Sequence, residues 1–228
     1  RHAGINFFFT FTTLAVNFAF ALLIVFTSQW CLTHSFGILQ WLHLLLWINI
    51  IIGLLLLDLI GAYTIHLIQH KVKWMWKFHM VHHADMHVDT TTANRHHPGE
   101  SVFRATFTLL AVFITGAPMW MVMLYQSISV VLAQFNHANI KLNPAVDKLI
   151  SWVIVSPDMH KVHHHFVRPQ TDSNYGNIFS VWDRLFGTFI YTPASQIKFG
   201  LDVLQGRSDE NIGQQLKIPF DNSIKTDY

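Results

Sequence analysis

The stretch ILQWLHLLLWINIIIGLLLLDLIGAYTIHLIQH, residues 38–70, is a long apolar segment that ends in two histidines. Its residues 38–65 carry a single charge, Asp58, and as a helix rising about 1.5 Å per residue they are long enough for a hydrocarbon core of about 30 Å. His66 and His70 lie four positions apart, so on a continuing helix they share one face. The stretch therefore predicts a membrane-spanning helix that brings two imidazoles to one place.

Two further apolar segments flank this one. Residues 5–30 carry no charge and are long enough for another span. Residues 102–136 are apolar but interrupted at Gly116-Ala117-Pro118, which predicts two shorter helices in a tight hairpin that enters the membrane and returns. With 51% hydrophobic and 12% charged residues, the 228-residue chain has the composition of a membrane protein rather than a water-soluble globule.

Most lysines and arginines lie in the segments 66–101 and 137–228. By the positive-inside rule both segments face the cytoplasm, which predicts a multi-pass protein of a bacterial inner membrane or the endoplasmic reticulum. The net charge of +2 is too small to indicate a nucleic-acid partner. Residues 193–228 are polar and are expected to pack on the cytoplasmic part as a solvated tail.

We predict one integral-membrane domain over residues 1–228, in the all-α class. Its spans are about 5–30, 38–65 and the hairpin 102–136. The expected architecture is a transmembrane helical bundle of about four membrane-embedded helices with a cytoplasmic helical cap that holds a polyhistidine site for two metals.

Histidine spacing supports such a site. The single cysteine, Cys31, cannot build a cysteine-type zinc site, so a metal here would be held by nitrogen or oxygen. The spacing i, i+3, i+4 occurs twice, once from residue 79 and once from residue 160, and on a helix each triplet converges on one face. His137 returns to the same side at the end of the hairpin. Nine histidines from four segments are therefore expected to meet, enough for two metals with positions left open.

Isolated histidines carry no such signal. His2, His34, His43 and His87 are typical amphipathic residues near a membrane interface, and we assign them no role. The clustered histidines would repel one another when charged, and a bound metal removes that repulsion.

The motifs HLIQH (66–70), HMVHH (79–83) and HKVHH (160–164) resemble the histidine signature of the fatty acid hydroxylase and sterol desaturase superfamily, which are integral-membrane non-haem diiron oxygenases. Three other stretches are similar to segments of that family: NRHHPGE (94–100), FNHANI (135–140) and NYGNIFSVWDRLFGT (174–188). The resemblance covers about residues 58–190, in order and at family-like separations.

The resemblance implies two iron ions, with dioxygen as co-substrate, and it implies these metal ligands: His66, His70, His79, His82, His83, His97, His137, His160, His163 and His164. His97 is the tenth by its place in the RHHP stretch, where His96 is the alternative. His165 is expected outside the ligand set, as a supporting or structural residue. Asp85 and Asp158 lie next to ligands and are expected either to accept a hydrogen bond from one or to have an ordinary helix-cap or solvated role. No catalytic residue beyond the ligands is assigned.

The same resemblance implies hydroxylation or desaturation of a lipid, such as a sterol or fatty acyl chain, with electrons from a separate ferredoxin or from cytochrome b5 and its reductase. A non-enzymatic metal carrier or sensor is the alternative function, although carriers place ionisable ligands near the bilayer midplane. A haem-bearing electron carrier would need paired axial histidines within facing spans, which the sequence lacks. HPGE (97–100) is only partly similar to the haem-binding motif of cytochrome b5, and we expect no fused electron-carrier domain.

Asp58 is an ionisable group within a span and is expected either to serve function or to form a pairing that stabilises the bundle. Trp182, Asp183 and Arg184 are expected to pack the cap rather than to act in chemistry.

Overall fold

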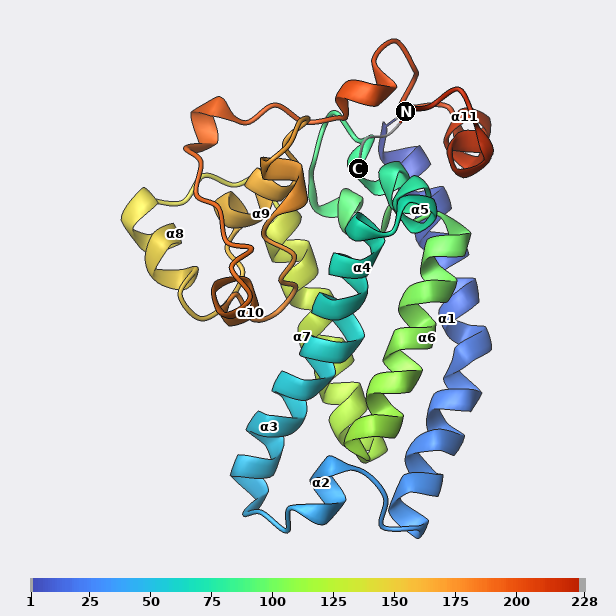
Figure 1. Cartoon of the computed structure of the whole chain (residues 1–228), viewed down its shortest axis with the longest axis vertical. Helices are drawn as coiled ribbons and strands as arrows, with labels where there is room; N and C mark the ends of the chain where they lie inside the picture. Colours follow the sequence, from blue (N-terminus) through green and yellow to red (C-terminus); the bar gives the residue numbers. More distant parts are fainter. Residues whose placement is uncertain (1, 226–228) are drawn as a thin grey trace.

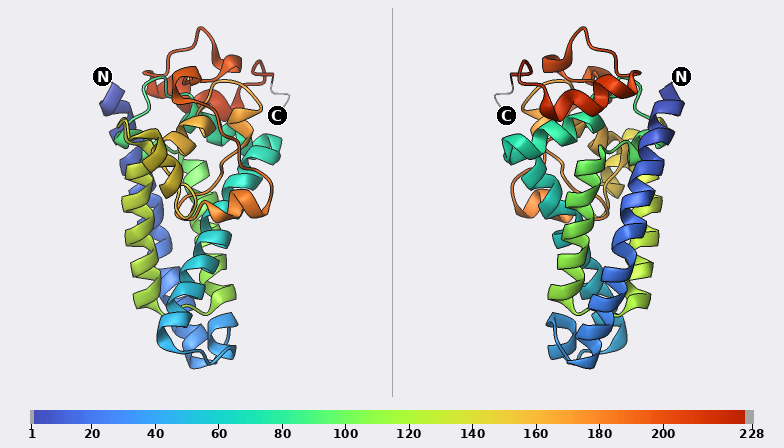
Figure 2. Two further views of the ribbon diagram at one scale, coloured as in Figure 1. Left: turned by 90° about the vertical axis from the view of Figure 1, so that its left-hand side faces the viewer. Right: turned by 90° about the vertical axis from the view of Figure 1, so that its right-hand side faces the viewer.

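Four long helical stretches form an elongated bundle (Figure 1). The structure is a computed structural model, and it describes residues 2–225. The stretches are α1 (His2–Thr33), the continuous run of α3 (Leu46–Asp58), η1 (Leu59–Thr64) and α4 (Ile65–Lys71), α6 (Pro98–Thr115) and α7 (Met119–His137). All four follow the long axis of the molecule, and the short α2 (Ile38–Trp41) closes one end (Figure 2).

The remaining elements gather at the opposite end, which we call the histidine end. They are α5 (Lys73–His83), η2 (Thr90–Asn94), α8 (Pro144–Ile150), α9 (Pro157–His163), η3 (Gln170–Asp172), α10 (Val181–Leu185), η4 (Ala194–Gln196), η5 (Asp202–Leu204), α11 (Ile212–Lys217) and η6 (Ile218–Phe220). Within residues 2–225 there is no strand, only an isolated antiparallel bridge between Ile154 and Phe179. The all-α class is thus confirmed.

The C-terminal segment is less solvated than its composition predicts. Leu201, Leu204 and Ile218 are buried in one apolar cluster with Trp76 of α5 and Phe9 of α1. This cluster fixes the histidine end onto the start of α1. The last three residues of the predicted tail, 226–228, and residue 1 lie outside the described part.

Two helical stretches of the described chain, His2–Trp41 and Leu46–Lys71, are each long and apolar enough to cross a membrane. The surface of α1 shows why water is a poor solvent for it: Phe11, Phe18 and Phe26 are at least 69% exposed. Burying such a row of rings in lipid is favourable, whereas a soluble protein would leave it in water.

The second predicted span is not one helix. It is interrupted at residues 42–45, between α2 and α3, where His43 adopts a φ of 45°. This left-handed conformation cannot continue a right-handed helix, which explains the break. Beyond the break the helix continues past the predicted end of the span at residue 65, as expected for His66 and His70, and ends at Lys71 after the π-helical η1.

The predicted hairpin is confirmed at its turn. α6 ends at Thr115, Gly116 caps it with a φ of 66°, and α7 begins after Pro118. The turn packs tightly against the loop after α1, since a Cβ built on Gly37 would lie 2.4 Å from the backbone nitrogen of Gly116. Gly37 also has a φ of 111°, so two constraints require glycine there.

We expect Gly37→Ala to destabilise the protein by about 2 kcal/mol, because the new methyl group forces the two loops apart and strains the backbone. Thermal unfolding in detergent would measure this. Gly4→Ala is the matched control, because a Cβ at Gly4 meets nothing within 4 Å and alanine favours the helix. Equal melting temperatures for the two variants would contradict the close approach.

Asp58 belongs to the bundle rather than to the site. Its buried carboxyl group accepts hydrogen bonds from the backbone N–H of Ile178 (3.2 Å) and Phe179 (3.2 Å) and from the indole N–H of Trp182 (3.0 Å). Of the two roles left open by the sequence, the contacts match the stabilising one, although the partners are N–H groups and not a cation. Asp58 thereby ties the segment before α10 to the junction of α3 and η1.

Candidate metal centre

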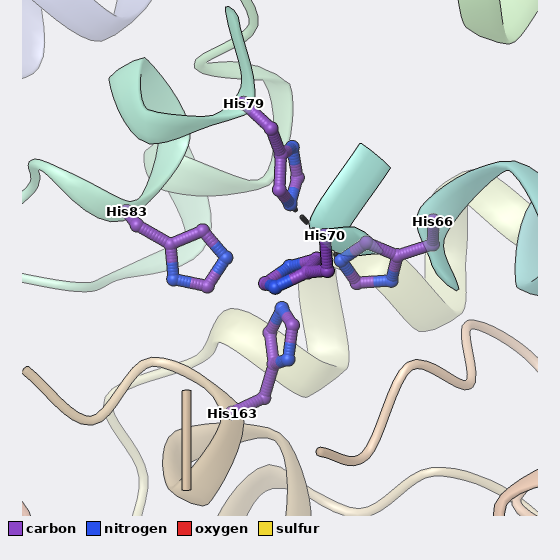
Figure 3. Close-up of side chains that lie close together, drawn as sticks. All are labelled: His66, His70, His79, His83 and His163. Carbon is purple, nitrogen blue, oxygen red and sulfur yellow. Dashed lines mark hydrogen bonds between the residues drawn. The ribbon is translucent and has the colours of Figure 1, made fainter. Parts of the chain in front are cut away.

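Nine buried histidines form two adjoining clusters at the histidine end. The five-histidine cluster consists of His66, His70, His79, His83 and His163 (Figure 3). The four-histidine cluster consists of His82, His137, His160 and His164. Within each cluster, one ring nitrogen of every residue lies within 4.8 Å of the others. The structure thus brings together nine of the ten predicted ligands, from α4, α5, α7 and α9.

Helix geometry distributes the two HxxHH motifs between the clusters. On α5, His79 and His83 share a face and enter the five-histidine cluster, while His82 points to the other. At α9 the division is reversed: His163 joins the five-histidine cluster, and His160 and His164 join the four-histidine cluster. Each motif therefore contributes to both clusters, and the two helices hold the clusters next to each other.

The spacing of ring nitrogens fits metal ligation. Nε2 of His66 lies 3.0 Å from Nε2 of His79. In the other cluster, Nε2 of His137 lies 3.3, 3.1 and 3.2 Å from the Nε2 atoms of His82, His160 and His164. Two imidazoles that each bind one ion at about 2.1 Å, at angles between right and tetrahedral, have nitrogens about 3.0 to 3.4 Å apart. The clusters match that separation.

Several ring nitrogens have no hydrogen-bond partner among the described residues. Both nitrogens of His70 and of His83, together with Nε2 of His163, are buried and unpaired. An unpaired buried polar atom costs about 1–3 kcal/mol, so a protein rarely keeps several at one place. A metal ion would satisfy them, and the residues present therefore fit such an ion.

The charge state of the imidazoles also suits a metal. Burial, followed by repulsion from neighbouring imidazoles, lowers the pKa of His82 and His83 well below its ordinary value and lowers the pKa of His163 to about 3. These rings are therefore neutral at pH 7, the form that binds metals.

Four of the clustered rings are oriented through their Nδ1–H groups. His66 donates to the carbonyl of Tyr175 at 2.8 Å, His163 to the carbonyl of Ser173 at 2.7 Å, and His137 to the carbonyl of Ala133 at 2.8 Å. His79 donates to the buried Glu100 carboxylate at 2.7 Å. Such bonds fix the tautomer and leave Nε2 for the metal.

Glu100 should contribute to metal affinity by holding His79. We expect Glu100→Gln to weaken iron binding about 10- to 100-fold, because the amide accepts from Nδ1–H more weakly than a carboxylate. Titration of the metal-free protein with ferrous ion would measure this. Asp158→Asn is the control: Asp158 pairs with Lys161 at 3.0 Å instead of with a ligand, so its loss should leave iron affinity unchanged. Equal affinities for wild type and Glu100→Gln would contradict the orienting role.

His97, the predicted tenth ligand, lies outside both clusters in the structure. His97 is the N-cap of α6: its Nδ1 accepts from the N–H of Gly99 at 3.0 Å, and its ring lies in neither cluster. The extended backbone before Pro98 turns the ring back onto the helix N-terminus. His96 instead lies against the four-histidine cluster, with its ring centroid 5.1 Å from that of His82.

The three predicted supporting residues lie elsewhere. Asp85 accepts from Asn6 at 3.2 Å and from Thr92 at 2.7 Å, so it anchors the start of α1. Asp158 pairs with Lys161, and His165 accepts from the backbone N–H of Lys198 at 3.1 Å. The described contacts join none of the three to a clustered histidine.

The sequence did not indicate the partners that orient the clustered histidines. Glu100 had one signal, its place in the NRHHPGE stretch. The carbonyls of Tyr175, Ser173 and Ala133 had none, because every residue has a carbonyl and only the fold directs it.

A small cavity of about 30 Å³ adjoins the clusters. Its lining includes His82, His96, His137 and Arg104, and the small residues Ala62, Ala93 and Ala133 leave the space open. A second cavity of about 120 Å³ lies beside it, between α1, α6 and α7. The two share lining residues, among them His96 and Arg104, so they adjoin each other.

Residues 50–188, more than half of the chain, match the sequence model of the family described as fatty acid hydroxylase. The chain belongs to the fatty acid hydroxylase family. Both histidine clusters of this fatty acid hydroxylase family member lie within the matched residues.

Curated relatives of this family member modify lipids. The chain is 25% identical to ornithine lipid hydroxylase of Rhizobium tropici over 173 residues, which are 75% of this chain and 50% of the relative. It is 31% identical to alkylglycerol monooxygenase of Xenopus tropicalis over 150 residues, 62% of this chain and 30% of the relative. It is 26% identical to human cholesterol 25-hydroxylase over 150 residues, 64% and 52% of the two chains. The chain thus spans about half the length of these relatives or less, and no solved structure is significantly similar to it.

Proposed function

We propose that this member of the fatty acid hydroxylase family is a membrane oxygenase that hydroxylates a lipid, with two iron ions held by the two histidine clusters. The observation that carries the proposal is the pair of adjoining, buried, all-imidazole clusters at one end of an apolar bundle. With iron bound, such a site supplies dioxygen activation for oxidising an unactivated C–H bond. The balanced reaction takes one lipid C–H bond, one O2, two electrons and two protons, and gives one alcohol and one water.

Ligand number supports two redox metals over a single zinc ion. Three or four imidazoles complete a zinc site, and here five and four are available side by side. Neutral imidazole suits iron, and a pair of ions can share the electrons that dioxygen reduction requires. The ligands would be the nine clustered histidines, with His96 rather than His97 as the tenth candidate.

The protein's own residues hold and shield the site. Glu100 and the carbonyls of Tyr175, Ser173 and Ala133 keep the rings oriented, and the burial of all nine histidines excludes bulk water. The adjoining cavities mark the side from which a lipid chain would approach the clusters, between α1, α6 and α7. The position of the chain there would select the carbon that is oxidised.

The membrane arrangement belongs to the same proposal. α1, α3 to α4, α6 and α7 would be membrane-embedded as a single domain, with the histidine end in the cytoplasm as the positive-inside rule indicates. Electrons would come from a separate ferredoxin or from cytochrome b5 with its reductase. Hydroxylation is favoured over desaturation because the curated relatives are named hydroxylases or monooxygenases.

Lipid analysis under isotopically labelled dioxygen tests this function. Cells expressing the chain should accumulate a lipid that is one labelled oxygen heavier, and cells expressing His83→Ala should not. A desaturated lipid in place of the hydroxylated one would show that the reaction is desaturation. Metal uptake without any change in lipids would favour a metal carrier and contradict the oxygenase.

A further inference from the structure

Arg104 is a cation inside the bundle that lines both cavities beside the histidine clusters. Its side chain is 26% exposed, and it lies one helical turn beyond Glu100 on α6. Among the described residues its nearest acidic group is Glu100, whose Oε1 is 3.9 Å from Nη1 of Arg104. Arg104 is therefore close to the candidate metal centre but only loosely paired.

The same carboxylate is already engaged elsewhere. Oε1 of Glu100 lies 2.7 Å from Nδ1 of His79 and 3.7 Å from Nε2 of His96. A guanidinium in an apolar bundle is costly unless an anion pairs with it at close range, and ionisable groups in such places usually mark a function. All three groups share Oε1, and Oε2 of Glu100 has no hydrogen-bond partner among the described residues, so most of the donors of Arg104 are left for another partner.

The cavity that Arg104 faces is polar. Its lining includes Thr13 and Asn17 of α1, Thr108 of α6, and Gln126 and Ser129 of α7. The hydroxyls of Thr13 and Ser101 lie 2.9 Å apart, which fixes α1 against α6 at this level.

The mouth of this cavity differs from the surface around it. Asn17 and Gln126 are exposed, whereas the neighbouring Phe18, Met123 and Val130 form exposed apolar surface. A group of amides and hydroxyls at one place on such a surface suits a polar head group entering sideways from the bilayer.

We propose that Arg104 binds the anionic group of the lipid substrate, a carboxylate or a phosphate, and so places a carbon a few bonds away against the four-histidine cluster. The proposal rests on the proposed function and narrows its substrate class. Guanidinium binds both oxyanions through paired hydrogen bonds, so the chemistry is shared by a free fatty acid and a phospholipid. The tail of the lipid would extend along the apolar surface outside.

Lipid binding to the iron-loaded protein tests this without turnover. Native mass spectrometry would compare palmitate with hexadecanol and phosphatidate with diacylglycerol, each pair differing in the anionic group. We expect the wild type to bind the anionic member of one pair at least about tenfold more tightly. The preferred pair tells a carboxylate from a phosphate.

Variants then test whether Arg104 is responsible for the preference for the anionic lipid. Arg104→Gln should abolish it, and Arg104→Lys should keep a reduced preference because the cation remains. Lys148→Gln, which removes an exposed charge on α8, should leave it unchanged. A preference that persists in Arg104→Gln overturns the proposal.

Two further results distinguish the Arg104 proposal from the proposed oxygenase activity, and the first of them can be read even if a variant misfolds. Equal binding within both lipid pairs by the wild type overturns the role of Arg104 even if Arg104→Gln fails to fold. A preference that depends on Arg104, in a protein that makes no hydroxylated lipid, supports the binding role and overturns only the proposed oxygenase activity.

Discussion

Protein purified in mild detergent should contain about two iron ions per chain, and a ligand variant in either cluster should lower that number. We expect His83→Ala, in the five-histidine cluster, and His160→Ala, in the four-histidine cluster, each to reduce the iron content to about one ion or fewer. Hydroxylation should fall at least about a hundredfold in both, since even residues that only orient metal ligands change activity 10- to 100-fold. Elemental mass spectrometry and product analysis would measure the two effects.

The structure provides a control at His97, a residue that the sequence predicts to be a ligand. His97→Ala should retain two iron ions, because His97 caps α6 and lies in neither cluster. Its loss should cost about 1 kcal/mol of stability, the usual effect of removing a helix cap. One zinc ion per chain, or an iron content unchanged in both ligand variants, would contradict the two-iron site.

The histidine spacing was sufficient to predict which residues gather, because helical periodicity determines the face on which a side chain lies. It could not assign the histidines to two clusters. That division depends on the angle between α5 and the helices around it, so His82 and His83, adjacent in sequence, point to different clusters. The same limit applies to His96 and His97, because the backbone conformation before Pro98 decides which of the two rings faces the four-histidine cluster.

The helices of the bundle could also be predicted from the sequence, but their irregular parts could not. Apolar length and the Gly116-Ala117-Pro118 break indicated the helices and the hairpin turn. The break at residues 42–45 and the π-helical η1 left no mark in an apolar run, because leucine and isoleucine occur in both regular and distorted helices.

Asp58→Ala should be the most destabilising single substitution in the bundle. It removes the fully buried acceptor of three N–H groups, those of Ile178, Phe179 and Trp182. At about 1–3 kcal/mol for each unsatisfied buried donor, we expect a loss of about 3 kcal/mol or more. Thermal unfolding in detergent would measure it. Asp58→Asn keeps one acceptor oxygen in the same place and should lose clearly less.

The effect should extend to the metal centre, because the anchored segment also orients a ligand. Asp183 accepts from the N–H of Tyr175 at 2.7 Å and the N–H of Gly176 at 2.9 Å, and the carbonyl of Tyr175 holds His66. Releasing Ile178 and Phe179 at one end of this segment frees the Tyr175 carbonyl to move, so His66 loses its fixed orientation. Folded Asp58→Ala protein should therefore bind iron more weakly than Asp58→Asn. Equal iron affinity in the two would show that Asp183 alone positions the segment.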